Sequence, residues 1–160
     1  SDIRPGRSNQ SHTRFKGSER GTSCSGAKLR VRSSTSPIRV RYSETDKMGV
    51  VYHANYLVWF EIGRTDLLRI IGWSYRQMEA TGILLPVIEA HCEYRKPSQY
   101  DDELKVITRG ELLSPTRVGF NYEICWLDGE VSAVGRTVHA AINEQRRPCR
   151  LPEQLSSVLA

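Results

Sequence analysis

The sequence contains no long apolar run. Its longest apolar stretches, Tyr56 to Phe60 and Gly82 to Ile88, are far shorter than the roughly 20 residues that a membrane-spanning helix needs. Residues 1–20 contain only Ile3 and Phe15 as large apolar residues, so they lack the apolar region of a secretory signal peptide. We therefore expect a cytoplasmic protein without a membrane span.

Cysteine is scarce, with four residues in a chain of 160, and the four are widely spaced. The sequence has no Cys-x-x-Cys pair and no histidine spacing typical of a zinc site. The run His91-Cys92-Glu93 contains three potential ligands, but neighbouring side chains of a strand point to opposite faces, so the three cannot converge. We expect no bound metal and, by default, a reducing compartment.

Acidic residues are rare in residues 1–36, which carry eight basic and two acidic groups, whereas the rest of the chain carries 15 basic and 16 acidic groups. This basic tail is rich in Ser and Gly and has no apolar period, so we expect it to be disordered. Its composition is compatible with an anionic partner or with import into an organelle. Aromatic residues are not interleaved as base stacking requires, so we favour an extension without function and expect no nucleic-acid partner.

The pattern changes at Pro37, and we assign residues 37–160 to one folded domain. Ile38, Val40 and Tyr42 alternate with polar residues, which predicts a half-buried strand. Asp128-Gly129 predicts a tight hairpin between the last two strands. The same alternation with a period of two predicts further strands over residues 88–94, 104–109, 118–126 and 131–142.

One long segment breaks this alternation. Residues 54–71 are apolar on nearly all sides and precede Gly72, which predicts a helix of about 25 Å enclosed by other elements. Ser74 is expected to cap a short helix that stops at Gly82, and residues 152–159 form a short terminal helix. The order of elements predicts an α+β fold in which a sheet wraps around the long helix. Because such a sheet leaves an edge exposed, we also expect a homo-oligomer.

The segment between the first strand and the long helix contains the candidate catalytic residues. Asp46-Lys47-Met48-Gly49 fits a type I turn in which Asp46 binds its own backbone, and this structural interpretation competes with a catalytic one. The amides that open the helix near Tyr52 and His53 carry about half a positive charge and would polarise the carbonyl of a bound acyl group. Asp46, ionised at neutral pH, would then attack the carbonyl carbon or deprotonate a water that attacks it.

Three neighbours of Asp46 have both a functional and a structural interpretation. His53 would donate to the substrate or orient Asp46, or it would only pack at the helix entry. Asn55 would contact the substrate, although the role of helix N-cap is sufficient to explain it. Tyr52 is a candidate substrate contact, although tyrosines at such positions commonly serve packing.

The run from Tyr42 to Tyr56, Tyr-Ser-Glu-Thr-Asp-Lys-Met-Gly-Val-Val-Tyr-His-Ala-Asn-Tyr, resembles the signature of the YbgC branch of 4-hydroxybenzoyl-CoA thioesterase-like hotdog proteins. The resemblance covers about residues 38–142. It continues in three further elements, Phe60-Glu-Ile-Gly-Arg-Thr65, Tyr94-Arg-Lys-Pro97 and Tyr100-Asp-Asp-Glu-Leu104. The sequence departs from the family pattern at Lys47 and Met48, where the family usually has small residues, and in the basic tail.

This resemblance implies a hotdog fold with an antiparallel sheet around one central helix. It implies acyl-CoA hydrolysis, with Asp46 and His53 at the family's catalytic positions, and active sites at a dimer interface, where dimers often pair into tetramers. Coenzyme A would be part of the substrate, acyl-carrier protein is an alternative carrier, and no metal or redox cofactor is expected. A same-fold enoyl-thioester hydratase and a non-catalytic module that binds acyl-carrier protein or nucleic acid are the alternatives.

Two pairs of charged residues lie in the elements that resemble the family. Arg95 and Lys96, at a strand end, are candidates for binding the phosphates of coenzyme A, although a solvated sheet edge explains them slightly better. Glu61 and Arg64 lie three residues apart on one helix face and are expected to pair with each other, which would stabilise the helix by only a few tenths of a kcal/mol.

Overall fold

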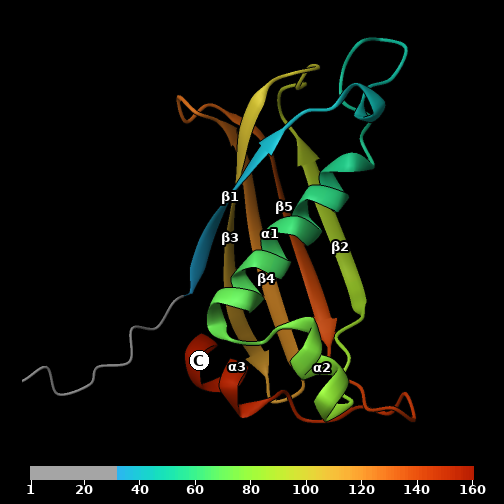
Figure 1. Ribbon diagram of the computed structural model, residues 1–160, viewed down its shortest axis with the longest axis vertical. Coiled ribbons are helices and arrows are strands. Elements are labelled where there is room, and N and C mark those ends of the chain that lie inside the picture. Colours follow the sequence, from blue (N-terminus) through green and yellow to red (C-terminus); the bar gives the residue numbers. More distant parts are fainter. Residues whose placement is uncertain (1–31) are drawn as a thin grey trace, which may run out of the picture.

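Five antiparallel strands form one curved sheet, and a long helix lies across its concave face (Figure 1). The computed structural model describes residues 32–160, and the sheet order is β1-β3-β4-β5-β2. The predicted α+β fold, with an antiparallel sheet around one long helix, is confirmed. The strands are β1 (Ser33–Arg39), β2 (Val87–Tyr94), β3 (Glu103–Ser114), β4 (Arg117–Trp126) and β5 (Val131–Ala140), and the helices are η1 (Tyr42–Glu44), α1 (Asn55–Ile71), α2 (Tyr75–Thr81) and α3 (Glu153–Leu159).

The first strand begins at Ser33, four residues before the predicted domain boundary. Ser34 and Ser36 are buried, and the Ser36 hydroxyl donates a hydrogen bond of 2.7 Å to Asp66 of α1. Small hydroxyl side chains let this strand lie close to the helix but show no apolar alternation, which is why composition alone assigned them to the tail. The predicted disorder of residues 1–31 lies outside the described residues and stays a prediction.

The alternation that predicted a strand through Tyr42 ends earlier. Val40 is buried, but Tyr42 is 78% exposed and opens the 3₁₀ turn η1. The turn forms because the Glu44 carboxylate accepts the backbone N–H of Arg41 at 2.9 Å, which draws the chain back on itself. The strand prediction was therefore wrong for the segment that leads to Asp46.

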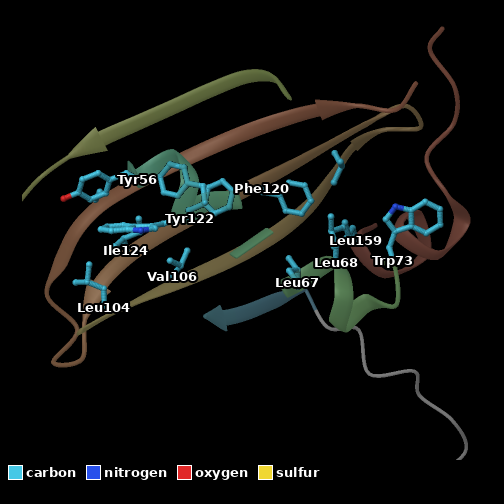
Figure 2. Packing of buried hydrophobic residues seen from close by; sticks show 14 of the residues in the cluster. Tyr56, Leu67, Leu68, Trp73, Leu104, Val106, Phe120, Tyr122, Ile124 and Leu159 are labelled. Atoms are coloured by element: carbon cyan, nitrogen blue, oxygen red, sulfur yellow. The ribbon is translucent and has the colours of Figure 1, made fainter. Parts of the chain in front are cut away.

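Two glycines set the depth at which α1 packs on the sheet. A Cβ on Gly63 would lie 2.2 Å from Thr108 Oγ1 of β3, and a Cβ on Gly135 of β5 would lie 2.3 Å from the ring of Phe60. Phe60 stacks on Tyr122, with ring centroids 4.3 Å apart, and Tyr122 lies in the middle of the core in Figure 2. Larger side chains at these positions would push the helix away from the sheet.

Only one face of α1 is covered, in contrast to the nearly complete enclosure that was predicted. Leu57, Val58 and Ile62 are 41%, 47% and 39% exposed. The edge strand β2 is also exposed along most of its length, and within it only Cys92 is half-buried, so the predicted core face of this strand was wrong. The reason is its place at the edge of the sheet, where β2 pairs with β5 alone.

The predicted ends of the elements are mostly confirmed. Gly72 and Gly82 end α1 and α2 with φ angles of +95° and +68°, a conformation that glycine adopts at little cost. Asp128-Gly129 closes the β4–β5 hairpin as predicted. β5 stops at Ala140, two residues early, because Ile142 instead forms isolated bridges outside the sheet. None of the helices in residues 32–160 is long and apolar enough to cross a membrane.

A chain of polar side chains crosses the core between α1 and the sheet. His139 is 1% exposed, and its Nδ1 lies 2.9 Å from the Leu85 carbonyl, which only accepts, so Nδ1 carries the proton. Burial lowers the pKa of His139 to about 4, so its Nε2 accepts from the Thr137 hydroxyl at 2.9 Å. Thr137 in turn accepts from Tyr122 at 2.6 Å, and Tyr122 accepts from Arg64 at 3.2 Å. Each hydrogen bond in this chain is therefore donated in the direction that leads from Arg64 to the Leu85 carbonyl.

The buried His139 makes stability depend on pH. Its pKa is about 4 when folded and about 6.5 when unfolded, so between these values only the unfolded chain binds the proton. We predict that the free energy of unfolding falls by up to about 3 kcal/mol as pH drops from 6.5 to 4 because of this group. Urea titrations should show that this fall is smaller in His139→Gln than in the parent protein. Parallel pH profiles of the two proteins would contradict the prediction.

Candidate active site

Asp46 lies in a tight turn that occupies one of its two carboxylate oxygens. Its carbonyl accepts the Gly49 N–H at 3.0 Å, and its Oδ1 accepts the Met48 N–H at 2.8 Å. Gly49 has a φ of +79°, which the closing position of this turn requires. The predicted turn is confirmed. Oδ2 has no hydrogen-bond partner in the described part of the chain, so one oxygen of Asp46 shapes the turn and the other is left without a partner.

The buried carboxylate of Glu44 ties the Asp46 turn to α1. Its Oε2 accepts the Trp59 indole N–H at 2.8 Å, and its backbone carbonyl accepts from the amide side chain of Asn55 at 2.9 Å and from the Tyr52 N–H at 2.8 Å. Glu44 and Trp59 are 5% and 1% exposed, so these bonds are shielded from water. Glu44 was not among the predicted site residues, because a glutamate in a polar run gives no sign that it is buried.

The N-cap of α1 lies one residue before the predicted N-cap, Asn55. Ala54 is the N-cap and Asn55 is the first helical residue, because the Asn55 side chain binds the Glu44 carbonyl instead of capping the helix. The amides of residues 55, 56 and 57 bond to carbonyls three residues earlier. Within residues 32–160 no acceptor binds the amides of His53 and Ala54. The free donors therefore belong to the turn just before α1.

Tyr94, at the end of β2, holds this turn in place. Its hydroxyl donates to the His53 carbonyl at 2.9 Å, and its ring meets the His53 ring edge to face, with centroids 6.3 Å apart. Desolvation, helped by the thiol of Cys92, raises the pKa of Tyr94 to about 12, so it remains a donor at neutral pH. The sequence contained one signal for this residue, its place in the element Tyr94 to Pro97 that resembles the family.

The Asp46 turn, the start of α1 and the end of β2 surround a cavity of about 270 Å³, hereafter the Asp46 cavity. Four predicted site residues line it: Asp46, His53, Arg95 and Lys96. The other two, Tyr52 and Asn55, line a more open hollow that Asp46 also borders. Asp46 is thus the one predicted residue that borders both spaces.

The ion pairs that form around these residues do not include the predicted Glu61–Arg64 pair. Arg95 pairs with Glu93 at 3.0 Å and Lys96 pairs with Glu130, in exposed contacts that contribute little to stability. The expected Glu61–Arg64 pair is absent from the described residues, because Arg64 turns toward Tyr122. In the same residues, no three His, Cys, Asp or Glu side chains gather as a metal site would require.

The sequence profile of the thioesterase-like superfamily matches residues 40–159. The chain belongs to this superfamily. This thioesterase-like chain is 40% identical, over 70% of its length and 81% of the other protein, to YneP from Bacillus subtilis (strain 168), which is provisionally named an acyl-CoA thioesterase. It is 35% identical to the acyl-CoA thioester hydrolase YbgC of Escherichia coli O157:H7, over 55% of this chain and 66% of that protein.

The solved structures agree with this assignment. The crystal structure of DHNA-CoA thioesterase from Staphylococcus aureus matches with a TM-score of 0.73 and 40% sequence identity, over 79% of this chain and 90% of that one. The thioesterase-like chain therefore has the hotdog fold that the resemblance implied, and its recognition as a YbgC-type member of the hotdog superfamily is confirmed.

The Glu44–Trp59 hydrogen bond gives a test of how the Asp46 turn is held. Trp59→Phe removes the donor and leaves a buried carboxylate with one partner fewer, which we predict lowers the free energy of unfolding by about 2–4 kcal/mol. Amide hydrogen exchange should also become faster at Met48 and Gly49. Urea titration and exchange measured by NMR check the two effects.

Trp126→Phe is the matched control, because Trp126 also donates its indole N–H to a carboxylate, that of Asp102, at 3.1 Å. Asp102 is half-buried and also accepts the Gln99 N–H, so the loss should be smaller than in Trp59→Phe. Exchange at Met48 and Gly49 should be unchanged in this control. Equal destabilisation and equal exchange in both variants would contradict the role assigned to Glu44.

Proposed function

We propose that this protein hydrolyses acyl-CoA thioesters to a free acid and coenzyme A, with Asp46 as nucleophile or general base. The observation that carries the proposal is the free Oδ2 of Asp46 beside a cavity that His53 also lines. The names of the relatives agree with this chemistry, since YbgC is named an acyl-CoA thioester hydrolase and the Staphylococcus aureus protein a DHNA-CoA thioesterase.

The free amides of His53 and Ala54 would supply the polarising groups. A thioester carbonyl oxygen that accepts from them would be stabilised as negative charge develops, and one such donor is worth about 3–4 kcal/mol in the transition state. Tyr94 fixes these amides by binding the His53 carbonyl. The imidazole of His53, exposed beside the cavity, is available to donate to the substrate.

The free oxygen of Asp46 serves two routes. In the first, Oδ2 attacks the carbonyl carbon and the C–S bond breaks, so that coenzyme A leaves as a thiolate; a water then hydrolyses the mixed anhydride, and the proton that this water releases neutralises the thiolate. In the second, Oδ2 takes a proton from a water as that water attacks the same carbon, the C–S bond breaks, and the proton passes from Asp46 to the departing thiolate. Both routes consume one water and release one acid and one thiol.

The rim residues fit the carrier portion of the substrate. Arg95 and Lys96 line the Asp46 cavity, and their ion pairs with Glu93 and Glu130 are exposed. Because exposed pairs are weak, phosphate groups can replace the carboxylates at small cost. Tyr52 and Asn55, which border the open hollow behind Asp46, are proposed to contact the part of the substrate that lies outside the Asp46 cavity.

A second copy of the chain would cover the apolar surface that one copy leaves open. The unpaired edge of β2 and the exposed face of α1 at Leu57, Val58 and Ile62 lie next to each other, and Leu57, Val58 and Val87 border one hollow. A free strand edge beside exposed apolar side chains is a surface that proteins commonly bury by self-association. We therefore propose a homodimer, or a tetramer of two dimers, that pairs through this face.

The variant Asp46→Asn tests the catalytic assignment. Asparagine keeps the Oδ1 that accepts the Met48 N–H, so the turn and the fold should survive, but it lacks the carboxylate oxygen that reacts. We predict that kcat for acyl-CoA hydrolysis falls at least about a hundredfold. Thiol release from a panel of aliphatic and aromatic acyl-CoAs measures this change and also identifies the preferred acyl group.

Asp128→Asn is the matched control, because Asp128 Oδ1 accepts the Glu130 N–H at 2.9 Å in the same kind of turn, at the β4–β5 hairpin. Its kcat should equal that of the parent protein. Retained turnover in Asp46→Asn, with the same thermal stability as the control, would refute the catalytic assignment.

Two equally exposed leucines provide a test of the proposed subunit interface. Leu57 of α1 and Leu113 of β3 are 41% and 40% exposed in one copy, and only Leu57 lies on the face proposed to pair. Sedimentation velocity should show a dimer or tetramer for the parent protein and for Leu113→Glu, and a monomer for Leu57→Glu. A monomeric parent protein, or the same assembly in both variants, would contradict the proposed interface.

A further inference from the structure

A second cavity lies at the opposite end of α1 from the Asp46 cavity. It measures about 240 Å³ and is enclosed by α1, α2 and the sheet. The Asp46 cavity reaches α1 at Tyr56, whereas the second cavity is lined by α1 residues from Glu61 to Arg69 and by Trp73 beyond the helix. Figure 2 places Tyr56 at one end of the core and Trp73 at the other. Leu68, Trp73, Met78, Leu85 and Phe120 make most of its wall apolar.

Two residues that line this cavity have hydrogen-bond donors without a full set of acceptors. Trp73 is 4% exposed, and its indole N–H is buried with no acceptor in residues 32–160. Buried donors without a partner are rare and call for a physical explanation. The half-buried guanidinium of Arg64 makes a single side-chain hydrogen bond, to Tyr122, and no ion pair with any carboxylate in the described chain.

The chain of polar side chains that begins at Arg64 does not neutralise the positive charge of the guanidinium. Every donor in it points away from Arg64, and His139 is neutral above about pH 4, so the chain offers no negative charge. The other charged groups that line the cavity are Arg69, which pairs with Asp66 at 3.1 Å, and the exposed Glu61. Arg64 is therefore a cation without an anion beside an apolar space.

We propose that this cavity binds a small carboxylate with an apolar body, such as an aryl carboxylic acid or a short-chain fatty acid. The carboxylate would accept from Arg64, and guanidinium–carboxylate hydrogen bonds are among the strongest in proteins. It would also accept from the Trp73 indole N–H, which is covered in the empty cavity, once the ring shifts to uncover it. The apolar body would contact Met78, Leu85 and Phe120. The volume lies below the roughly 300 Å³ of sites for drug-sized ligands, so one ring or a short chain fits.

This site is independent of the Asp46 chemistry. The acid that thioester hydrolysis releases belongs to the same ligand class, and that link rests on the proposed function. Binding itself needs no turnover. Asp46→Asn should therefore bind the ligand as the parent protein does, so the two proposals can fail separately.

The test is a titration of the full chain with sodium benzoate, followed by NMR at the indole N–H signals. The signal of Trp73, identified by its loss in Trp73→Phe, should shift saturably downfield as it gains an acceptor. Arg64→Gln should weaken binding at least tenfold, and Trp73→Phe should weaken it severalfold. Glu61→Gln, which removes the only unpaired acidic group of the cavity, should tighten binding.

The controls decide the outcome. Benzyl alcohol, which has the same ring without the charge, should bind at least tenfold more weakly than benzoate. Amide spectra of Arg64→Gln and Trp73→Phe verify that each variant is folded. The proposal is overturned if the Trp73 signal does not shift, if both folded variants bind benzoate as the parent does, or if Asp46→Asn abolishes binding, which would place benzoate in the Asp46 cavity.

Discussion

The hydrogen bond between the buried carboxylate of Glu44 and the indole of Trp59 is the constraint on which the Asp46 site depends. Glu44 is only 5% exposed, and a charged group can be buried only when hydrogen bonds replace those it made with water. Trp59 and Arg41 supply those bonds to the carboxylate, and Tyr52 and Asn55 at the helix entry bind the backbone carbonyl of Glu44. The position of Asp46 relative to the free amides before α1 is thereby fixed by an interaction that takes no part in the proposed chemistry.

Local signals predicted most of the fold, and the errors share one cause. Gly72, Gly82 and Asp128-Gly129 end or join elements through backbone conformations that sequence reports directly. Sequence does not report which strand lies at an edge, so the β2 alternation was assigned to the core. It also does not report a polar strand held by tertiary contacts, as at Ser34 and Ser36.

The site was predictable where its residues are close in sequence. The turn at Asp46 and the helix entry at His53 lie within one run, and the turn formed as predicted. Long-range partners were not predictable: Tyr94 of β2 reaches the His53 carbonyl, and the buried partner of Arg64, Tyr122, comes from β4. The sequence gives the spacing of charged residues along a helix, but not the direction in which each side chain points.

The divided roles of the two oxygens of Asp46 have a consequence for evolution. Asparagine supplies the same turn acceptor as aspartate, so selection for stability alone would let the two exchange freely at this position. At Asp128, where the carboxylate only holds a hairpin, such exchange should be common among relatives. If relatives keep aspartate at position 46 but exchange aspartate and asparagine at position 128, selection at position 46 acts on chemistry and not only on folding.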